Sequence, residues 1–265
     1  MQHRIVVLCG PKVTHKHTCA TLIRHGLNVV GICIADQRSA GLPLKYIRRD
    51  VERKGAAVTL SRVMARFLYA IQNLRADRKI FASLFDEQAI ESALHGWKGP
   101  IHRTADYSAP ETLAWLKDQA PDVIVAHTPY WVGKVVRNIP KTKIVLGGHP
   151  GVTPHYRGSH SAFWALYRGK PEDVGCTVFT LDDGVDTGDI VAQCRLSIDR
   201  GDSFITLGWK GMIQVAEMQA LVLRNLDAGV DLPRRRIESL PERSAFDNPT
   251  LAEYLTYRSR QRLAR

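Results

Sequence analysis

Residues 147–158 read GGHPGVTPHYRG, and residues 176–193 read CTVFTLDDGVDTGDIVAQ. The first stretch places His149 just after an apolar run, Lys143–Gly147, and before a loop rich in proline and glycine. The second places Asp186 in a turn between two further apolar runs. Loops that follow the buried strands of open α/β sheets are where ligands bind, and a histidine with a carboxylate can transfer protons there. The two stretches therefore predict an α/β fold with an acid–base site at the strand ends.

The N-terminal residues predict the first unit of a parallel sheet. Arg4–Cys9 and Leu27–Ile34 are apolar runs of strand length. Between them we expect a helix that has Thr14 as its N-cap and stops at Gly26. A strand–helix–strand unit of this size joins parallel strands by a right-handed crossover, so we expect a mostly parallel sheet.

The segment that follows is predicted to be helical. From Leu42 to about Trp97, apolar residues recur at steps of three and four, interleaved with arginine and lysine. We interpret about residues 41–103 as a helical insertion that covers one edge of the sheet. It could act as a lid or packing element, or it could serve substrate choice or dimerisation, so a homodimer is a possible assembly.

The two opening stretches resemble the signature of the folate-dependent formyltransferases, N-x-H-P-S-x-L-P-x-Y-R-G followed by D-x-G-x-D-T-G-x-I. The family includes methionyl-tRNA, glycinamide ribonucleotide and sugar N-formyltransferases. Gly151 and Thr153 replace the Ser and Leu of the signature, and Gly147 stands where the family has its catalytic Asn. The matching residues are His149, Pro150, Pro154, Tyr156, Arg157, Gly158, Asp182, Gly184, Asp186, Thr187, Gly188 and Ile190.

The resemblance implies a Rossmann-like, mostly parallel sheet of the formyltransferase type with a helical insertion. It places the catalytic domain at residues 1–229 and a C-terminal extension at residues 230–265. It also implies 10-formyltetrahydrofolate as the formyl donor. In this family His149 would donate a hydrogen bond to the tetrahedral oxyanion, and Asp186 would position the imidazole or a water and help to carry the proton. Without the resemblance, His149 could instead satisfy buried carbonyls, and Asp186 could stabilise its own turn.

Gly147 removes one oxyanion donor, and such a loss typically costs about 10²–10³ in rate. Three explanations are open. Another side chain from a nearby loop takes over, with Thr128, Ser159 and His160 as candidates. The Gly147–Gly148 pair turns a backbone N–H towards the oxyanion, since glycine permits unusual backbone geometry. Or the protein binds ligand with little catalysis.

The resemblance also places the folate and the substrate. Tyr130 and Trp131 could alternatively pack at a strand end, and Arg157 either contacts an anionic group of the substrate or positions its loop. Backbone amides of the Leu181–Asp186 segment would bond the edge of the pteridine. The predicted folate-binding residues are His127, Thr128, Pro129, Tyr130, Trp131, Leu181, Asp182, Asp183, Gly184 and Val185.

Composition narrows the function further. The chain has 265 residues, a net charge of +11 and 45% hydrophobic residues, which suits one large globular α/β domain. The turn at Gly10–Pro11 lacks the glycine patterns of nucleotide-binding loops, and His15 and His17 lack a third ligand nearby, so we predict no metal site. No apolar run reaches the length of a membrane span or a secretory leader, which predicts a cytoplasmic protein.

The acceptor is predicted by elimination. About 36 residues follow Gly229, too few for the C-terminal barrel that grips tRNA in the methionyl-tRNA enzymes, so a nucleic acid substrate is unlikely on this interpretation. We therefore expect N-formylation of a small-molecule amine, either an amino sugar, possibly nucleotide-linked, or an amino-acid-derived amine. The alternatives are a weak or inactive folate-binding member, or a methionyl-tRNA formyltransferase-like enzyme without the barrel.

Overall fold

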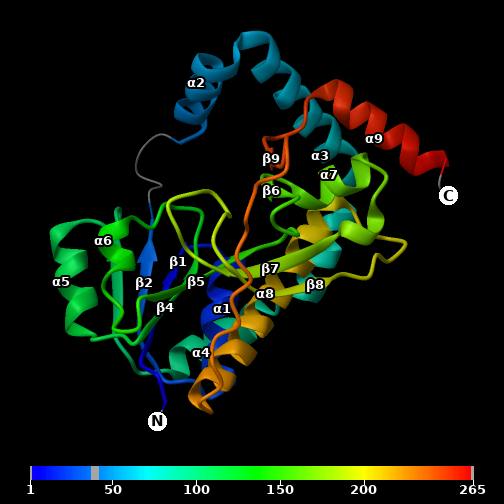
Figure 1. Ribbon diagram of the computed structural model, residues 1–265. Coiled ribbons are helices and arrows are strands. Elements are labelled where there is room, and N and C mark those ends of the chain that lie inside the picture. The colour runs from blue at the N-terminus through cyan, green and yellow to red at the C-terminus, as the bar shows by residue number, and fades with distance from the viewer. Residues whose placement is uncertain (1, 37–41, 264–265) are drawn as a thin grey trace.

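The computed structural model describes residues 2–36 and 42–263, which are organised around a seven-stranded sheet (Figure 1). The strand order is β3-β2-β1-β4-β5-β7-β8; the first five are parallel to their neighbours, whereas β7 and β8 are antiparallel. The predicted α/β, mostly parallel sheet is therefore confirmed. The strands are β1 Ile5–Cys9, β2 Val29–Ala35, β3 Ile101–Thr104, β4 Val123–His127, β5 Ile144–His149, β7 Gly175–Thr180 and β8 Ile190–Arg195.

Nine α-helices and one 3-10 helix are found in the part of the chain that the structure describes. Helix α8 begins at Phe204, directly after a reciprocal capping box between Ser203 and Thr206. The predicted N-cap of helix α1 is wrong, because the N-cap is Lys12 and Thr14 is buried within the first turn. The helices are α1 Val13–Arg24, α2 Leu42–Lys54, α3 Ala56–Leu84, α4 Glu87–Gly96, α5 Pro110–Asp118, α6 Lys134–Arg137, α7 Ser161–Tyr167, η2 Pro171–Asp173, α8 Phe204–Asp227 and α9 Leu251–Leu263.

The sheet is covered on both faces. Ile5 and Val7 of β1 pack into the cluster that includes residues of α1 and α8, whereas Val6 and Leu8 pack with residues of α5 and α6. Two-sided burial explains why the parallel strands are continuous apolar runs without alternation. Among the described helices, none has the length and apolar composition needed to cross a membrane.

The predicted insertion is helical but does not cover an edge of the sheet. Helix α4 packs on α1, and α3 packs on α8 and α9, so the insertion extends the helical layer. The edge strand is β3, and Ile101–Arg103, which the prediction assigned to the insertion, belong to it. Gly41, the predicted start, lies outside the described residues. In Figure 1, α2 and the start of α3 lie at the end of the molecule away from the N-terminus.

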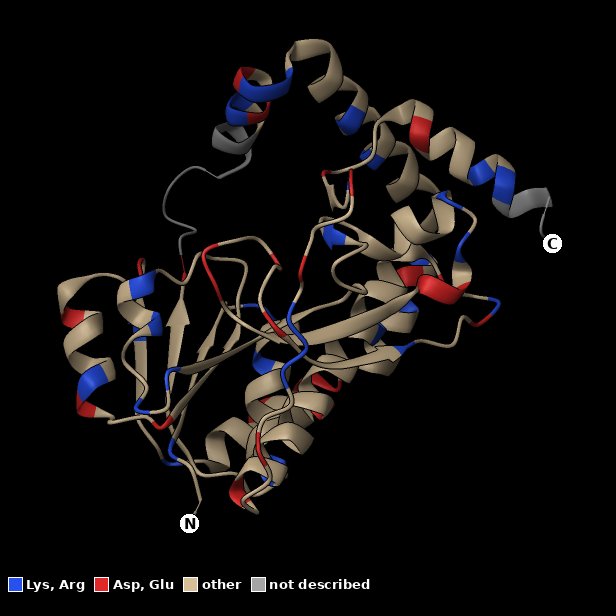
Figure 2. Ribbon diagram, in the orientation of Figure 1, with Lys and Arg blue, Asp and Glu red and all other residues tan. Residues whose placement is uncertain are grey.

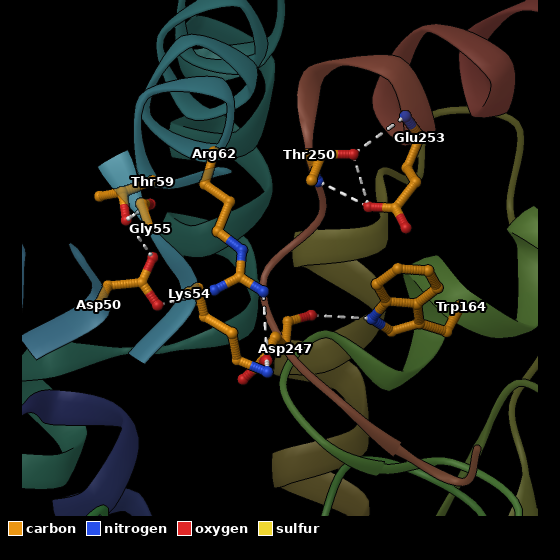
Figure 3. Close-up of polar contacts among 9 residues, drawn as sticks. All are labelled: Asp50, Lys54, Gly55, Thr59, Arg62, Trp164, Asp247, Thr250 and Glu253. Carbon is orange, nitrogen blue, oxygen red and sulfur yellow. Dashed lines mark hydrogen bonds and ion pairs between the residues drawn. The ribbon is translucent and has the colours of Figure 1, made fainter. Parts of the chain in front are cut away.

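The C-terminal residues pair with the signature loop. A two-residue strand, β9 (Ala245–Phe246), lies parallel to β6 (Arg157–Gly158). Just beyond it, the Asp247 carboxylate lies 2.9 Å from Lys54 Nζ and 3.1 Å from Arg62 Nη2, and its carbonyl accepts from Trp164 Nε1 at 3.1 Å (Figure 3). The C-terminal extension therefore connects the insertion to α7 and to the candidate site.

Candidate active site

His149 is the last residue of β5, and its ring is almost fully buried. Its Nε2 lies 3.0 Å from the Tyr156 carbonyl oxygen and 2.7 Å from Ser161 Oγ, while Nδ1 lies 3.5 Å from Asp186 Oδ2. The Tyr156 carbonyl and the Asp186 carboxylate both only accept, so the ring tautomer determines which of the two contacts is a hydrogen bond. Nδ1 is the nitrogen that faces the carboxylate.

Asp186 is brought to His149 by an unusual backbone conformation. Its φ is 52°, in the left-handed region that aspartate tolerates better than most residues. Its Oδ2 accepts a hydrogen bond of 3.0 Å from the Gly158 backbone N–H. The carboxylate is therefore fixed by the first half of the signature, although it belongs to the second half.

The turn around Asp186 is stabilised by a different aspartate. Asp182 Oδ1 accepts from the Gly184 N–H at 2.9 Å and from Thr187 Oγ1 at 2.6 Å. A Cβ at Gly188 would lie 1.5 Å from the Thr180 carbonyl oxygen, so only glycine fits there. The turn-stabilising role that the sequence left open for Asp186 therefore falls to Asp182, and Asp186 contacts His149.

Arg157 positions this loop. Its guanidinium is buried and donates to the Val185 carbonyl at 2.9 Å and to Ser244 Oγ at 3.1 and 3.3 Å. Of the two roles left open by the sequence, the geometry favours positioning over substrate contact. Ser244 was not identified from the sequence, because it lies in the C-terminal extension.

The space beside Gly147 is filled. A Cβ at this position would lie 2.7 Å from Leu181 Cδ2 and 3.0 Å from Phe179 Cε2. Gly148 is required for another reason, because its Cβ would lie 2.1 Å from Val215 Cγ1 on α8. Neither glycine has a positive φ, and both pair with β7. The pair therefore does not use the backbone freedom of glycine that one explanation needs.

The three candidate replacement donors differ in placement. Tyr107 Oη gives its single proton to the Cys9 carbonyl at 2.8 Å, so Thr128 Oγ1, 3.1 Å away, donates its own hydroxyl proton to Tyr107 Oη and also accepts from the Tyr130 N–H at 3.3 Å. The Ser159 N–H donates to the Phe246 carbonyl at 2.8 Å. The His160 ring lies edge-on against Phe204, and burial beside Arg66 lowers its pKa to about 4. His160 is therefore directed towards the α3–α8 side and is the weakest candidate.

Ser161 is a site residue that the sequence did not reveal. Its buried hydroxyl contacts His149 Nε2 from the first residue of α7. A Cβ at Gly151 would lie 2.4 Å from Ser161 Oγ and 2.6 Å from His149 Nε2. The family signature has serine at position 151, so Ser161 fills the space into which that side chain would point. The glycine at position 151 and the serine at position 161 are seen to be related only once the fold brings them together.

The predicted folate segments lie on neighbouring parts of the sheet. Arg137 of α6 holds the second of them, since its guanidinium bonds the Leu181 carbonyl and the Asp183 carboxylate. Trp131 is 58% exposed, so it does not pack at a strand end and remains open to a ligand. Two predicted backbone donors are engaged within the protein, because the Leu181 N–H bonds the Val145 carbonyl and the Gly184 N–H bonds Asp182.

His127 points into the protein, which corrects its predicted place in the folate loop. Its Nδ1 lies 2.7 Å from Thr18 Oγ1 on α1, and burial lowers its pKa to about 3. Burial beside Lys12 also lowers the pKa of His15 to about 4. This corner of the sheet therefore holds neutral histidines at neutral pH.

Two cavities stand out, and neither contains the histidine–carboxylate pair. One, of about 330 Å³, is lined by residues 190–193 and 233–235, and the other, of about 400 Å³, by residues 81–83 and 85–88. We place the candidate site by its chemistry, because the buried contacts of His149 and Asp186 have no counterpart in either cavity.

The fold and this pair define an α/β protein with a buried histidine–carboxylate contact at the ends of its strands. The model of the formyl transferase family matches residues 72–224, which is more than half of the chain. The protein belongs to this family of folate-dependent formyltransferases.

Individual relatives agree with this assignment. The methionyl-tRNA formyltransferase of Ehrlichia ruminantium is 33% identical over 143 residues, which are 49% of this chain and 46% of that protein. The chain thus spans about half the length of such relatives. Among solved structures, phosphoribosylglycinamide formyltransferase from Bacillus halodurans has a TM-score of 0.54 at 17% identity, covering 84% of this chain and 94% of that one. A sugar N-formyltransferase from Shewanella has a TM-score of 0.52 at 12% identity, covering 91% and 75%. Both structural likenesses concern the fold.

Proposed function

We propose that the protein transfers a formyl group from 10-formyltetrahydrofolate to the amine of a small-molecule acceptor. The observation that carries the proposal is the buried contact between His149 Nδ1 and Asp186 Oδ2, within a matched signature. The exposed indole of Trp131 suits a flat aromatic ring system such as a pteridine.

10-Formyltetrahydrofolate supplies the formyl group, and the protein handles the proton. The acceptor amine must lose a proton as its nitrogen bonds to the formyl carbon. His149 Nδ1 accepts that proton, and the Asp186 carboxylate stabilises the imidazolium. The new Nδ1–H can then donate to the charge that develops on the formyl oxygen, and finally to the leaving nitrogen. The bonds of Nε2 to Tyr156 and Ser161 hold the ring in this orientation throughout.

The acceptor class is part of the proposal. A sugar N-formyltransferase and a phosphoribosylglycinamide formyltransferase share the fold, while methionyl-tRNA formyltransferases match by sequence. We favour an amino sugar, possibly nucleotide-linked, or an amino-acid-derived amine.

The test is a transfer assay with pooled amines and tRNA, in which formylated products are identified by mass spectrometry. His149→Ala and Asp186→Asn should each lower the rate by about 10² or more, with His155→Ala, an exposed residue of the same loop, as the matched control. Turnover within a few-fold of wild type for either variant would remove that residue from the mechanism, and formylated tRNA would refute the small-molecule acceptor.

A second candidate is a folate-binding protein with little catalysis, which the filled space beside Gly147 favours. Titration calorimetry with a stable folate analogue separates the two. Binding without turnover on any acceptor supports the second candidate, whereas no binding at millimolar ligand contradicts both.

A further inference from the structure

Helix α3 carries apolar side chains on both of its long faces. One face packs into the protein, through Ala65, Leu68 and Tyr69, against α7, α8 and α9. On the other face six large apolar side chains are 46–68% exposed and recur every three or four residues. We call this set the α3 stripe: Leu60, Val63, Met64, Phe67, Ile71 and Leu74. A helix that is apolar all round is normally buried all round.

The stripe has the size of an interface. From Leu60 to Leu74 it runs about 21 Å along the helix. Its side chains expose roughly 600–700 Å², which exceeds the largest patch of most monomers and approaches the ~800 Å² that each partner of a stable complex buries.

The stripe is also free of charge, as the centres of interfaces are. Arg62 and Arg66 are the charged residues between Leu60 and Leu74. Arg62 is directed towards the body of the protein, because it is paired with Asp50 and Asp247, whereas Arg66 is exposed and its position on the helix lies to one side of the stripe.

We propose that the α3 stripe is the interface of a homodimer in which α3 packs antiparallel against α3 of a second copy. The stripe is symmetric about Phe67, which is seven residues from both Leu60 and Leu74. A two-fold axis at Phe67 places Leu60 against Leu74 of the second copy and Val63 against Ile71. Such self-complementarity is what a two-fold interface requires.

Basic residues flank the stripe at both ends. Arg75, Arg78 and Lys79 follow the stripe at its C-terminal end, and Figure 2 shows further Lys and Arg on α2. A parallel pair would place the arginines against their own copies. The antiparallel pair separates the two copies of Arg78 by about 33 Å but brings each towards the α2 end of the second copy, so the antiparallel direction rests on the symmetry of the stripe.

The first test is sedimentation equilibrium of the full chain at about 1–100 µM. We expect a wild-type dimer, and a dissociation constant raised at least about 100-fold by Phe67→Asp. Leu221→Asp, at a 59% exposed leucine of α8, is the matched control and should leave the dimer intact. A wild-type monomer throughout this range, or a Phe67→Asp dimer of unchanged affinity, overturns the proposal.

The second test fixes the register and does not depend on how Phe67→Asp folds. Under mild oxidation, Phe67→Cys should form a disulfide-linked dimer, whereas Leu221→Cys should not. Leu60→Cys and Leu74→Cys should cross-link when mixed with each other but not when alone. Cross-linking of Leu60→Cys alone would show a parallel pair and overturn the arrangement. Cosedimentation of a monomer with phosphatidylserine vesicles would overturn the choice of partner.

Discussion

Replacing Gly147 by asparagine tests whether the site has been rebuilt around glycine. An added Cβ would lie 2.7 Å from Leu181 Cδ2, closer than real Cβ atoms approach, and 3.0 Å from Phe179 Cε2. The asparagine amide would extend further into the same space. Leu181 is the flexible neighbour and has to move, and it belongs to the predicted folate segment.

The expected cost follows from this crowding. Overpacking a filled interior costs about 1–3 kcal/mol, and removal of a strand glycine offsets about 0.5–1 kcal/mol. We therefore expect Gly147→Asn to lower the free energy of unfolding by about 1–2 kcal/mol, which is a fall in Tm of roughly 2–8 °C for a chain of this size. We also expect a lower transfer rate, since the restored donor would displace Leu181.

Differential scanning calorimetry and the transfer assay test this prediction on four proteins: the wild type, Gly147→Asn, Leu181→Ala and the double variant. Because Leu181→Ala relieves the crowding, we expect the free energy of unfolding of the double variant to exceed the value predicted from the two single variants by about 1 kcal/mol or more. Additivity within about 0.5 kcal/mol would show that the two positions do not compete for space. A rate gain of about 10²–10³ from Gly147→Asn alone would refute a replaced donor, because that is the value of a restored one.

Three further predictions concern neighbouring groups. Because the folded pKa values of His15 and His127 lie below the unfolded value of 6.5, their contribution to stability is complete above about pH 6.5. It is lost as pH falls towards 3–4, by up to about 1.4 kcal/mol per histidine per pH unit. Urea unfolding at pH 7.5 and 5.0 should therefore show a smaller drop in the free energy of unfolding for His127→Asn than for the wild type. Arg157→Ala should cost about 1–3 kcal/mol and speed amide hydrogen exchange in residues 183–188, and unchanged exchange would contradict its positioning role. Gly151→Ser should lower the Tm of the wild type more than that of Ser161→Ala, and equal effects would show that the two side chains do not share a space.

Local patterns predicted most of the fold. The apolar run at Arg4–Cys9 is strand β1 because both of its faces are buried, and α8 starts at Ser203 because a capping box is a local device. The signature loops also lie at the ends of β5 and β7, where the apolar runs before them placed the site. These features depend on neighbours in sequence.

Contacts between distant residues were not predictable in the same way. The two-residue strands β6 and β9 have no periodicity to detect, and their pairing depends on the whole fold. Ser161, Arg137 and Ser244 are unremarkable in sequence and gain their roles from partners that other elements supply. The direction of His127 was not predictable because β4 is buried on both faces, and its contact is with Thr18 of the distant helix α1.

The pairing of β6 with β9 has a consequence for folding during synthesis on the ribosome. Arg157 and Gly158, which hold Val185 and Asp186, are themselves held by Ser244 and its neighbours. At about 5–20 residues per second, translation delivers Ser244 roughly 2–10 s after Arg195, the last residue of the sheet. During that interval a nascent chain has its sheet but not its finished loop, so we expect ribosome-bound chains stalled before Ser244 to be folded and yet unable to hold Asp186 in place.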